Sequence, residues 1–337
     1  MKQLITALFW LIAILASLEP QAYANNLSRT LPMWPTRPYL VHVPSPVPTG
    51  ALPIFLAIHG GGGNASAMLR STCASGDPSD STCLNALSDQ EGFVVVYPNG
   101  TANPDWCKQD PKYCEVRTFN AGGGKFGYNC ASGYACDTDI DELAYFNNLL
   151  SDVATIVNVD QSRIYASGIS NGGAMSHRLA CQMSNRIAAI ASVAAANQFS
   201  TSDDCSPVRA VPVMEIHGLS DAVWPYYGGP SNQSTVVGDM FSEKTSVQDW
   251  VIRNHCDPGA GIVNWLPNVD PINGTRAGIA INSSCADNSE VIHYFIQGGG
   301  HAWPGGWQIL PPSTMGYVSY AISGNQIIWD FFKSHHL

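Results

Sequence analysis

Six continuous apolar runs, separated by polar loops and helical patterns, most constrain the fold of this chain. They span residues 53–59, 92–98, 163–168, 187–195, 211–217 and 290–296. Runs of this kind fit strands that are buried on both faces of a parallel sheet. Helical spacing of apolar side chains occurs between them, at residues 141–159, 246–254 and 325–332. The alternation predicts an α/β fold with a mostly parallel central sheet flanked by helices.

The first 24 residues have the pattern of a secretory signal peptide. Lys2 precedes a mostly apolar run over residues 4–18, and residues 22–24 (Ala-Tyr-Ala) form a small-x-small cleavage site. The run is shorter than the ~20 residues of a membrane-spanning helix, which favours export with cleavage over a membrane anchor. We therefore expect a secreted protein, extracellular or periplasmic, in which residues 25–337 form a single domain.

The chain has ten cysteines, and an even number in an exported protein favours disulfides. Sequence alone does not fix their pairing, but we expect near neighbours to pair, most firmly the last two pairs. The expected pairs are Cys73–Cys83, Cys107–Cys114, Cys130–Cys136, Cys181–Cys205 and Cys256–Cys285. A zinc site is disfavoured because no C-x-x-C pair and no Cys/His cluster with ligand spacing is present. No metal is expected.

The net charge is −10, only 12% of residues are charged, and no basic cluster stands out. This composition argues against nucleic acid and anionic membrane surfaces as partners.

One short motif, Gly168-x-Ser170-x-Gly172, lies between a predicted strand and a predicted helix. Alone it could be a structural glycine-rich turn. A strand-to-helix turn is also the context of a nucleophile elbow, where the serine has a strained backbone and its crowded neighbours must be glycine. Ser170 is therefore the candidate nucleophile.

A nucleophilic serine needs a base and an acid, which in α/β-hydrolases follow in the order Ser, Asp or Glu, His. Asp221 lies in the loop after the run that ends at His217, on the same predicted sheet edge as Ser170. His301 lies in a glycine-rich loop after the last predicted strand. We expect these two residues as acid and base. The rival aspartates 203, 204 and 249 do not directly follow a strong strand, and histidines 255, 293, 335 and 336 are less well placed.

The glycine-rich stretch after residues 53–59 is the candidate oxyanion hole, because glycines let backbone N–H groups approach a carbonyl closely. One donor would come from Gly61 or Gly62 and the other from Asn171. A phosphate cradle would need a Walker-type or dinucleotide-binding pattern, and neither is present.

Several motifs occur together and in order: FNAGGG, DIDELAYFNNLL, RIYASGISNGGAMSHRLAC, IHGLSDAVWPYYGG, VQDWVIRNHC and GGGHAWPGG. With them the chain, from about Tyr39 to its end, resembles the extracellular esterases that group polyhydroxybutyrate depolymerases with feruloyl and acetylxylan esterases. The resemblance implies an α/β-hydrolase fold and ester hydrolysis by Ser170, His301 and Asp221, without a cofactor. It also implies disulfides at Cys181/Cys205 and Cys256/Cys285.

Substrate contacts are expected from aromatic residues beside the acid and the base. The resemblance implies Trp303 as one contact, and Trp224, Tyr226 and Tyr227 closely follow Asp221. Each of them could instead be packing. We expect a monomeric hydrolase of polymeric or oligomeric esters, with a polyester first and feruloyl or acetyl esters of plant polysaccharide as the alternative. A peptidase, a long-chain lipase and a non-catalytic polymer-binding protein are less favoured.

Overall fold

A ten-stranded sheet forms the centre of the protein in a computed structural model that describes residues 26–130, 133–232, 238–257 and 262–337. In spatial order its strands are β1 (Asn26–Arg29), β2 (Tyr39–His42), β4 (Val94–Tyr97), β3 (Leu52–Ile58), β7 (Val159–Ile169), β8 (Ala189–Val193), β9 (Val213–Gly218), β14 (Val291–Gln297), β13 (Arg276–Asn282) and β12 (Ile262–Val269). The strands from β4 to β14 are parallel, and antiparallel strands flank them on both sides.

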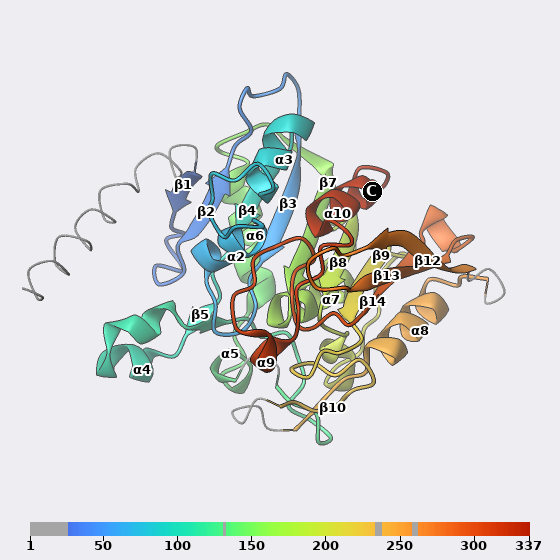
Figure 1. The fold of residues 1–337 in the computed structure, drawn as a ribbon. Helices are drawn as coiled ribbons and strands as arrows, with labels where there is room; N and C mark the ends of the chain where they lie inside the picture. The colour runs from blue at the N-terminus through green and yellow to red at the C-terminus, as the bar shows by residue number, and fades with distance from the viewer. Residues whose placement is uncertain (1–25, 131–132, 233–237, 258–261) are drawn as a thin grey trace, which may run out of the picture.

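Helices cover both faces of the sheet and divide the core in two (Figure 1). One face packs against α6 (Glu142–Val153), α7 (Asn171–Gln182) and α8 (Glu243–Arg253). The other packs against α2 (Ala65–Ser71), α3 (Leu84–Glu91) and α10 (Gly324–Phe332). Along β3, Ile54 and Leu56 join the first core cluster and Phe55 joins the second. Burial on both faces explains why this strand reads as a continuous apolar run.

Short elements lie in the loops that leave the carboxyl ends of the parallel strands, at the lower edge of the sheet in Figure 1. They are β5 (Thr101–Ala102), α4 (Pro104–Gln109), η1 (Pro111–Glu115), β6 (Arg117–Thr118), α5 (Tyr134–Asp137), η2 (Gln198–Thr201), β10 (Gly229–Pro230), β11 (Asp239–Met240) and α9 (Pro312–Met315). One further turn, η3 (Ala286–Asn288), connects β13 to β14.

The predicted fold class is confirmed, and the differences are local. The helix expected over residues 141–159 ends at Val153, and β7 already begins at Val159. The antiparallel pair β12 and β13 was missed: β12 contains Pro267 and polar residues, and the short apolar stretch of β13 contains Gly278, which weakens a strand pattern.

All ten cysteines are joined in disulfides between the expected neighbours, and none is free. Cys181–Cys205 and Cys256–Cys285 close the longest loops, of 24 and 29 residues. The expected signal peptide lies outside the described residues. Among the residues that are described, no helix has the length and hydrophobicity needed to cross a membrane.

A buried ion pair connects Arg37 in the N-terminal segment to Glu142, the first residue of α6. Arg37 Nη2 donates to Glu142 Oε2 at 2.6 Å, with the two side chains 2% and 0% exposed. The second Glu142 oxygen accepts the N–H of Asn120 at 3.0 Å, and Arg37 Nε donates to the carbonyl of Asn99 at 2.9 Å. The pair therefore fixes both ends of the loop over residues 99–120, whose position matters for the site described below.

We expect Glu142→Ala to lower the free energy of unfolding by about 3–5 kcal/mol, because it leaves the Arg37 guanidinium buried without its counter-ion. Asp105→Ala is the matched control. It removes a pair with Lys108 whose side chains are 75% and 77% exposed, and should change stability by about 1 kcal/mol or less. Denaturant unfolding at neutral pH measures both. If Glu142→Ala lowers the free energy of unfolding as little as Asp105→Ala does, the buried pair is not important for stability.

Candidate active site

Ser170 lies on a sharp turn between β7 and α7, at the carboxyl edge of the parallel strands. Its backbone has φ 56° and ψ −124°, a conformation that is strained for a residue with a side chain. The Ser170 N–H donates to the carbonyl of Val193 on β8 at 2.9 Å, which holds the turn against the sheet. Ser170 itself is half-buried.

At this turn the chain passes very close to β3. A Cβ atom on Gly168 would lie 2.6 Å from the carbonyl oxygen of Ile58, and one on Gly172 would lie 2.2 Å from the same oxygen. Neither approach is sterically possible for a larger residue. The two glycines of the motif therefore have the crowded positions that the sequence predicted.

The hydrogen bonds of the backbone N–H groups distinguish between the candidate donors of the oxyanion hole. Gly62 donates its N–H to the carbonyl of Arg117 at 2.9 Å, so the expectation that Gly62 could be a donor is wrong in this conformation. The Gly61 N–H has no hydrogen-bond partner within the described part of the chain. A Cβ on Gly61 would lie 3.6 Å from that of Asn171, so the two residues are neighbours. Asn171 is the first residue of α7, where an N–H has no intrahelical acceptor.

Two buried side chains hold these backbone groups in place. The Asn171 amide accepts the Phe119 N–H at 2.8 Å and donates to the Phe119 carbonyl at 3.0 Å. His59 Nε2 accepts the Gly100 N–H at 3.0 Å, which leaves the Nδ1 proton to donate to the Gly60 carbonyl at 2.8 Å. Burial lowers the pKa of His59 to about 3, so this arrangement stays neutral.

Asp221 and His301 are in direct contact. His301 Nδ1 lies 2.7 Å from Asp221 Oδ2, and the side chains are 10% and 0% exposed. Asp221 follows β9 and His301 follows β14, which are adjacent parallel strands. The His301 N–H donates to the carbonyl of Met315 at 2.6 Å, which fixes the loop that carries the imidazole.

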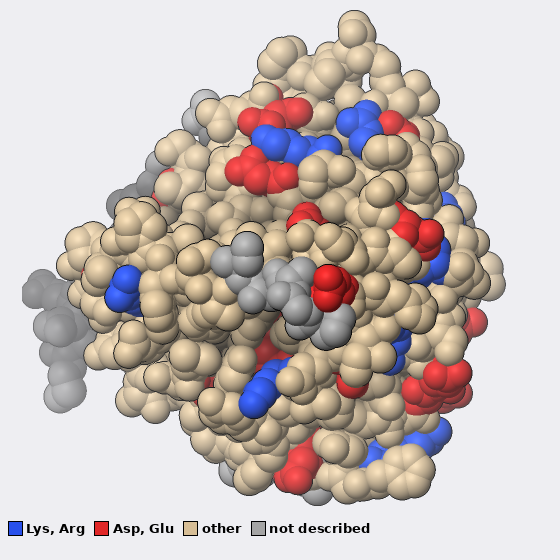
Figure 2. Space-filling model, turned by 90° about the vertical axis from the view of Figure 1, so that its right-hand side faces the viewer, with Lys and Arg blue, Asp and Glu red and all other residues tan. Residues whose placement is uncertain are grey.

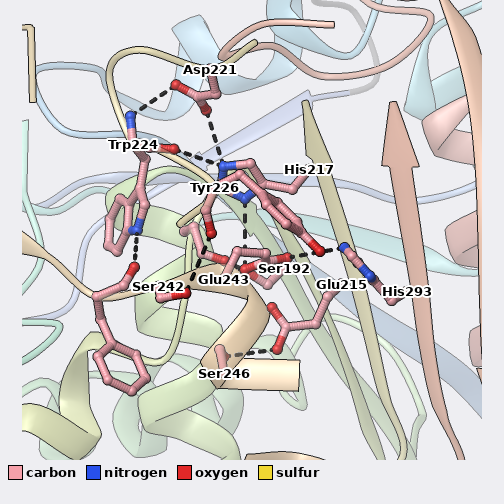
Figure 3. A network of polar contacts seen from close by, with 12 residues as sticks. Ser192, Glu215, His217, Asp221, Trp224, Tyr226, Ser242, Glu243, Ser246 and His293 are labelled. Carbon is pink, nitrogen blue, oxygen red and sulfur yellow. Dashed lines mark hydrogen bonds and ion pairs between the residues drawn. The ribbon is translucent and has the colours of Figure 1, made fainter. Parts of the chain in front are cut away.

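The Asp221 carboxylate is surrounded by donors. Its Oδ1 accepts the N–H groups of Val223 and Trp224, both at 2.8 Å, and its Oδ2 is also 3.4 Å from His217 Nε2 (Figure 3). Burial alone would raise the pKa of Asp221. The charge of His301 and the hydrogen bonds from His217 and His301 outweigh burial and hold that pKa well below its usual range. Asp221 is therefore ionised across the physiological pH range.

The expected tryptophan contacts with substrate are not supported. Trp303 is 1% exposed, packs in the second core cluster, and donates its indole N–H to Asn325 Oδ1 at 3.0 Å. Trp224 is also 1% exposed and donates to the carbonyl of Phe241 at 2.9 Å. Their large apolar rings and bonded N–H groups make both residues parts of the core. Tyr226 is half-buried and stacks on His293, whereas Tyr227 is 77% exposed.

Sequence reasoning missed the polar residues beneath Asp221. Glu215 and His217 are fully buried on β9, and Glu243 on α8 faces His217. The sequence contained a signal for these residues, because Glu215 and His217 are two ionisable residues within an apolar run that is buried on both faces. No group of three or more His, Cys, Asp or Glu side chains in the described residues is arranged to hold a metal ion.

No protein-family model matches the chain. A putative esterase, NocK, from Nocardia uniformis subsp. tsuyamanensis is 26% identical over 304 residues, which cover 88% of this chain and 79% of that protein. Feruloyl esterase B of Piromyces equi is 30% identical over 173 residues, or 50% of this chain. The bifunctional acetylxylan esterase/xylanase XynS20E of Neocallimastix patriciarum is 26% identical over 66% of this chain. The chain spans only 30% and 26% of the lengths of the two fungal proteins.

Two solved structures share the fold. An acetyl xylan esterase from Aspergillus awamori aligns with a TM-score of 0.52 at 13% identity, over 88% of this chain and 94% of that structure. A thermostable esterase aligns with a TM-score of 0.52 at 14% identity, over 94% of this chain and 64% of that structure. The two structures show that the chain has the α/β-hydrolase fold. Its sequence homologues are named as esterases, and the chain is related to feruloyl and acetylxylan esterases.

Proposed function

We propose that this protein is a secreted serine esterase in which Ser170 is the nucleophile, His301 the base and Asp221 the acid. The observation that carries the proposal is the 2.7 Å contact between Asp221 and His301, at the sheet edge where Ser170 occupies its strained turn. The five disulfides support secretion, because such bonds persist in oxidising compartments.

The proposed reaction is an acyl transfer in two steps. His301 Nε2 takes the Ser170 proton as the hydroxyl oxygen attacks the ester carbonyl, and Asp221 orients and stabilises the resulting imidazolium. The N–H groups of Gly61 and Asn171 stabilise the oxyanion. His301 then protonates the departing alcohol. Water attacks the acyl-enzyme by the same route, which releases the acid and regenerates Ser170.

For the substrate, we propose feruloyl or acetyl esters of plant cell-wall polysaccharide. The named activities of the fungal homologues support this class, which the sequence placed second. Tyr227 and Tyr317 replace the buried tryptophans as proposed aromatic contacts: they are 77% and 47% exposed, and the Tyr317 carbonyl accepts the N–H of Gly300, beside His301. Polyhydroxybutyrate stays a prediction that no described contact favours.

The absence of nucleic-acid and membrane partners and the monomeric state also stay predictions. The face of the molecule in Figure 2 bears small mixed groups of acidic and basic side chains and no extended basic patch, which supports a neutral polymer as the partner.

We expect Ser170→Ala to lower kcat by a factor of about 10³ or more without lowering the melting temperature, because it removes only the attacking oxygen. Ser176→Ala is the matched control on the same helix, since within the described residues the Ser176 hydroxyl bonds only to the Gly172 carbonyl, at 3.0 Å. Hydrolysis of a chromogenic acetate ester measures both variants. Full activity in Ser170→Ala would exclude the proposed nucleophile.

We further expect the mature protein to release ferulate or acetate from a feruloylated oligosaccharide or acetylated xylan more efficiently than 3-hydroxybutyrate from amorphous polyhydroxybutyrate. Chromatography of the products, with Ser170→Ala as the blank, makes the comparison. Release of 3-hydroxybutyrate or its dimer alone would replace the proposed substrate class by a polyester.

A further inference from the structure

Five ionisable side chains form a buried acid–base cluster beneath Asp221. Figure 3 shows Glu215, His217, Glu243 and His293 of this cluster. They come from four elements and are each no more than 5% exposed: His177 on α7, Glu215 and His217 on β9, Glu243 on α8 and His293 on β14. Burying so many ionisable groups is costly unless they are paired. Packing alone therefore does not account for this cluster.

The proton on one nitrogen of His217 is fixed by its surroundings. His217 Nε2 lies 2.8 Å from the carbonyl oxygen of Trp224, and a carbonyl can only accept. Nε2 must therefore carry a hydrogen. The same nitrogen lies 3.4 Å from Asp221 Oδ2, the oxygen that contacts His301. The Nε2 hydrogen is donated to Trp224, and the same nitrogen lies within ion-pair distance of the carboxylate that orients the proposed base.

The other nitrogen of His217 faces an acid. His217 Nδ1 lies 3.6 Å from Glu243 Oε2, with both side chains 0% exposed. Nδ1 has no hydrogen-bond partner among the described residues, so Glu243 is the group available to balance a charge on it. Ser242 caps α8 and holds Glu243, the first residue of that helix, at this place.

Two groups compete for the proton between Nδ1 and Oε2. Burial and the nearby Glu215 carboxylate raise the pKa of Glu243. Burial lowers the pKa of His217, but the charge of Glu243 and the hydrogen bond to Asp221 raise it, and the net pKa lies well above its usual value. The ionised Asp221 contacts His217, and this second carboxylate places the proton on His217.

Glu215 supplies a further negative charge beside Glu243, and other side chains pack around these groups. Burial lowers the pKa of His293 to about 4, so this residue is neutral near pH 7. Trp250 Nε1 donates to His177 Nδ1 at 3.0 Å, and His177 Nε2 faces Glu215 at 3.4 Å. Glu215 also accepts the Ser246 hydroxyl at 2.9 Å. The uncharged ring of Tyr226 covers His217 and His293.

We propose that His217 is a positioning residue for the catalytic acid: as an imidazolium paired with Glu243, it holds Asp221 Oδ2 from beneath while His301 binds the same oxygen. The proposal rests on the proposed function of Asp221 and His301. Its consequence is electrostatic. The positive charge on His217 lies on the other side of Asp221 Oδ2 from the His301 imidazole. It opposes protonation of this proposed base and therefore keeps the enzyme active to lower pH.

We expect His217→Gln to move the acidic limb of the kcat/KM–pH profile upward by about one pH unit, because glutamine keeps a donor toward Trp224 and lacks the charge. Glu243→Gln should move the limb in the same direction, because His217 then loses its counter-ion. His293→Gln is the matched control: it removes a buried imidazole that faces Glu243 at 4.0 Å but does not touch Asp221, so the limb should stay in place.

A structural role alone would lower the melting temperatures of the three variants and leave the acidic limb where it is in the wild type. An unmoved limb in both His217→Gln and Glu243→Gln, in folded protein, would overturn the proposal.

The second measurement does not depend on catalysis. In protein with ¹⁵N-labelled histidine, the His217 signals, identified by their absence in His217→Gln, should show both ring nitrogens protonated at pH 7. In Glu243→Gln they should show the neutral form with the proton on Nε2. A neutral His217 in the wild type would refute the inference even if Ser170→Ala confirms the nucleophile. Activity retained in Ser170→Ala would refute the proposed function and leave the state of His217 measurable.

Discussion

The close approach of the turn after β7 to the end of β3 is the constraint on which the proposed site depends. Gly168 and Gly172 both face the carbonyl of Ile58 at distances that no Cβ atom tolerates. Within this packing Ser170 has a positive φ and Asn171 lies beside Gly61. The proposed nucleophile and the two proposed oxyanion donors are therefore positioned by backbone packing, which costs little reorganisation when charge develops.

A second set of groups supports the proposed catalytic acid from within the sheet. Strand β9 ends in the turn that carries Asp221, and its buried residue His217 supports the carboxylate from within the sheet. Glu243 on α8 completes the support. The loop over residues 99–120, fixed by Arg37 and Glu142, in turn holds Asn171 through Phe119. Residues that lie far apart in the sequence thus hold the proposed catalytic groups in position.

The sequence predicted the parts of this protein that rest on local patterns. Continuous apolar runs indicated the buried parallel strands, and the Gly-x-Ser-x-Gly spacing indicated the strained turn. Asp221 and His301 could be chosen from chain order and their positions after strands, and the structure brings them into contact. Trp303 and Trp224 could not be judged in this way, because whether an aromatic ring faces solvent or the core depends on tertiary packing. The same is true of Gly62, whose N–H is used by Arg117.

The central claim is that Ser170 attacks an acyl group whose oxyanion is held by Gly61 and Asn171. A crystal structure of the protein after reaction with a fluorophosphonate tests it most directly. The account predicts phosphorus bonded to Ser170 Oγ, with a phosphonyl oxygen about 2.7–3.1 Å from both N–H groups. A covalent adduct on another residue, or a phosphonyl oxygen bound by other donors, would contradict it.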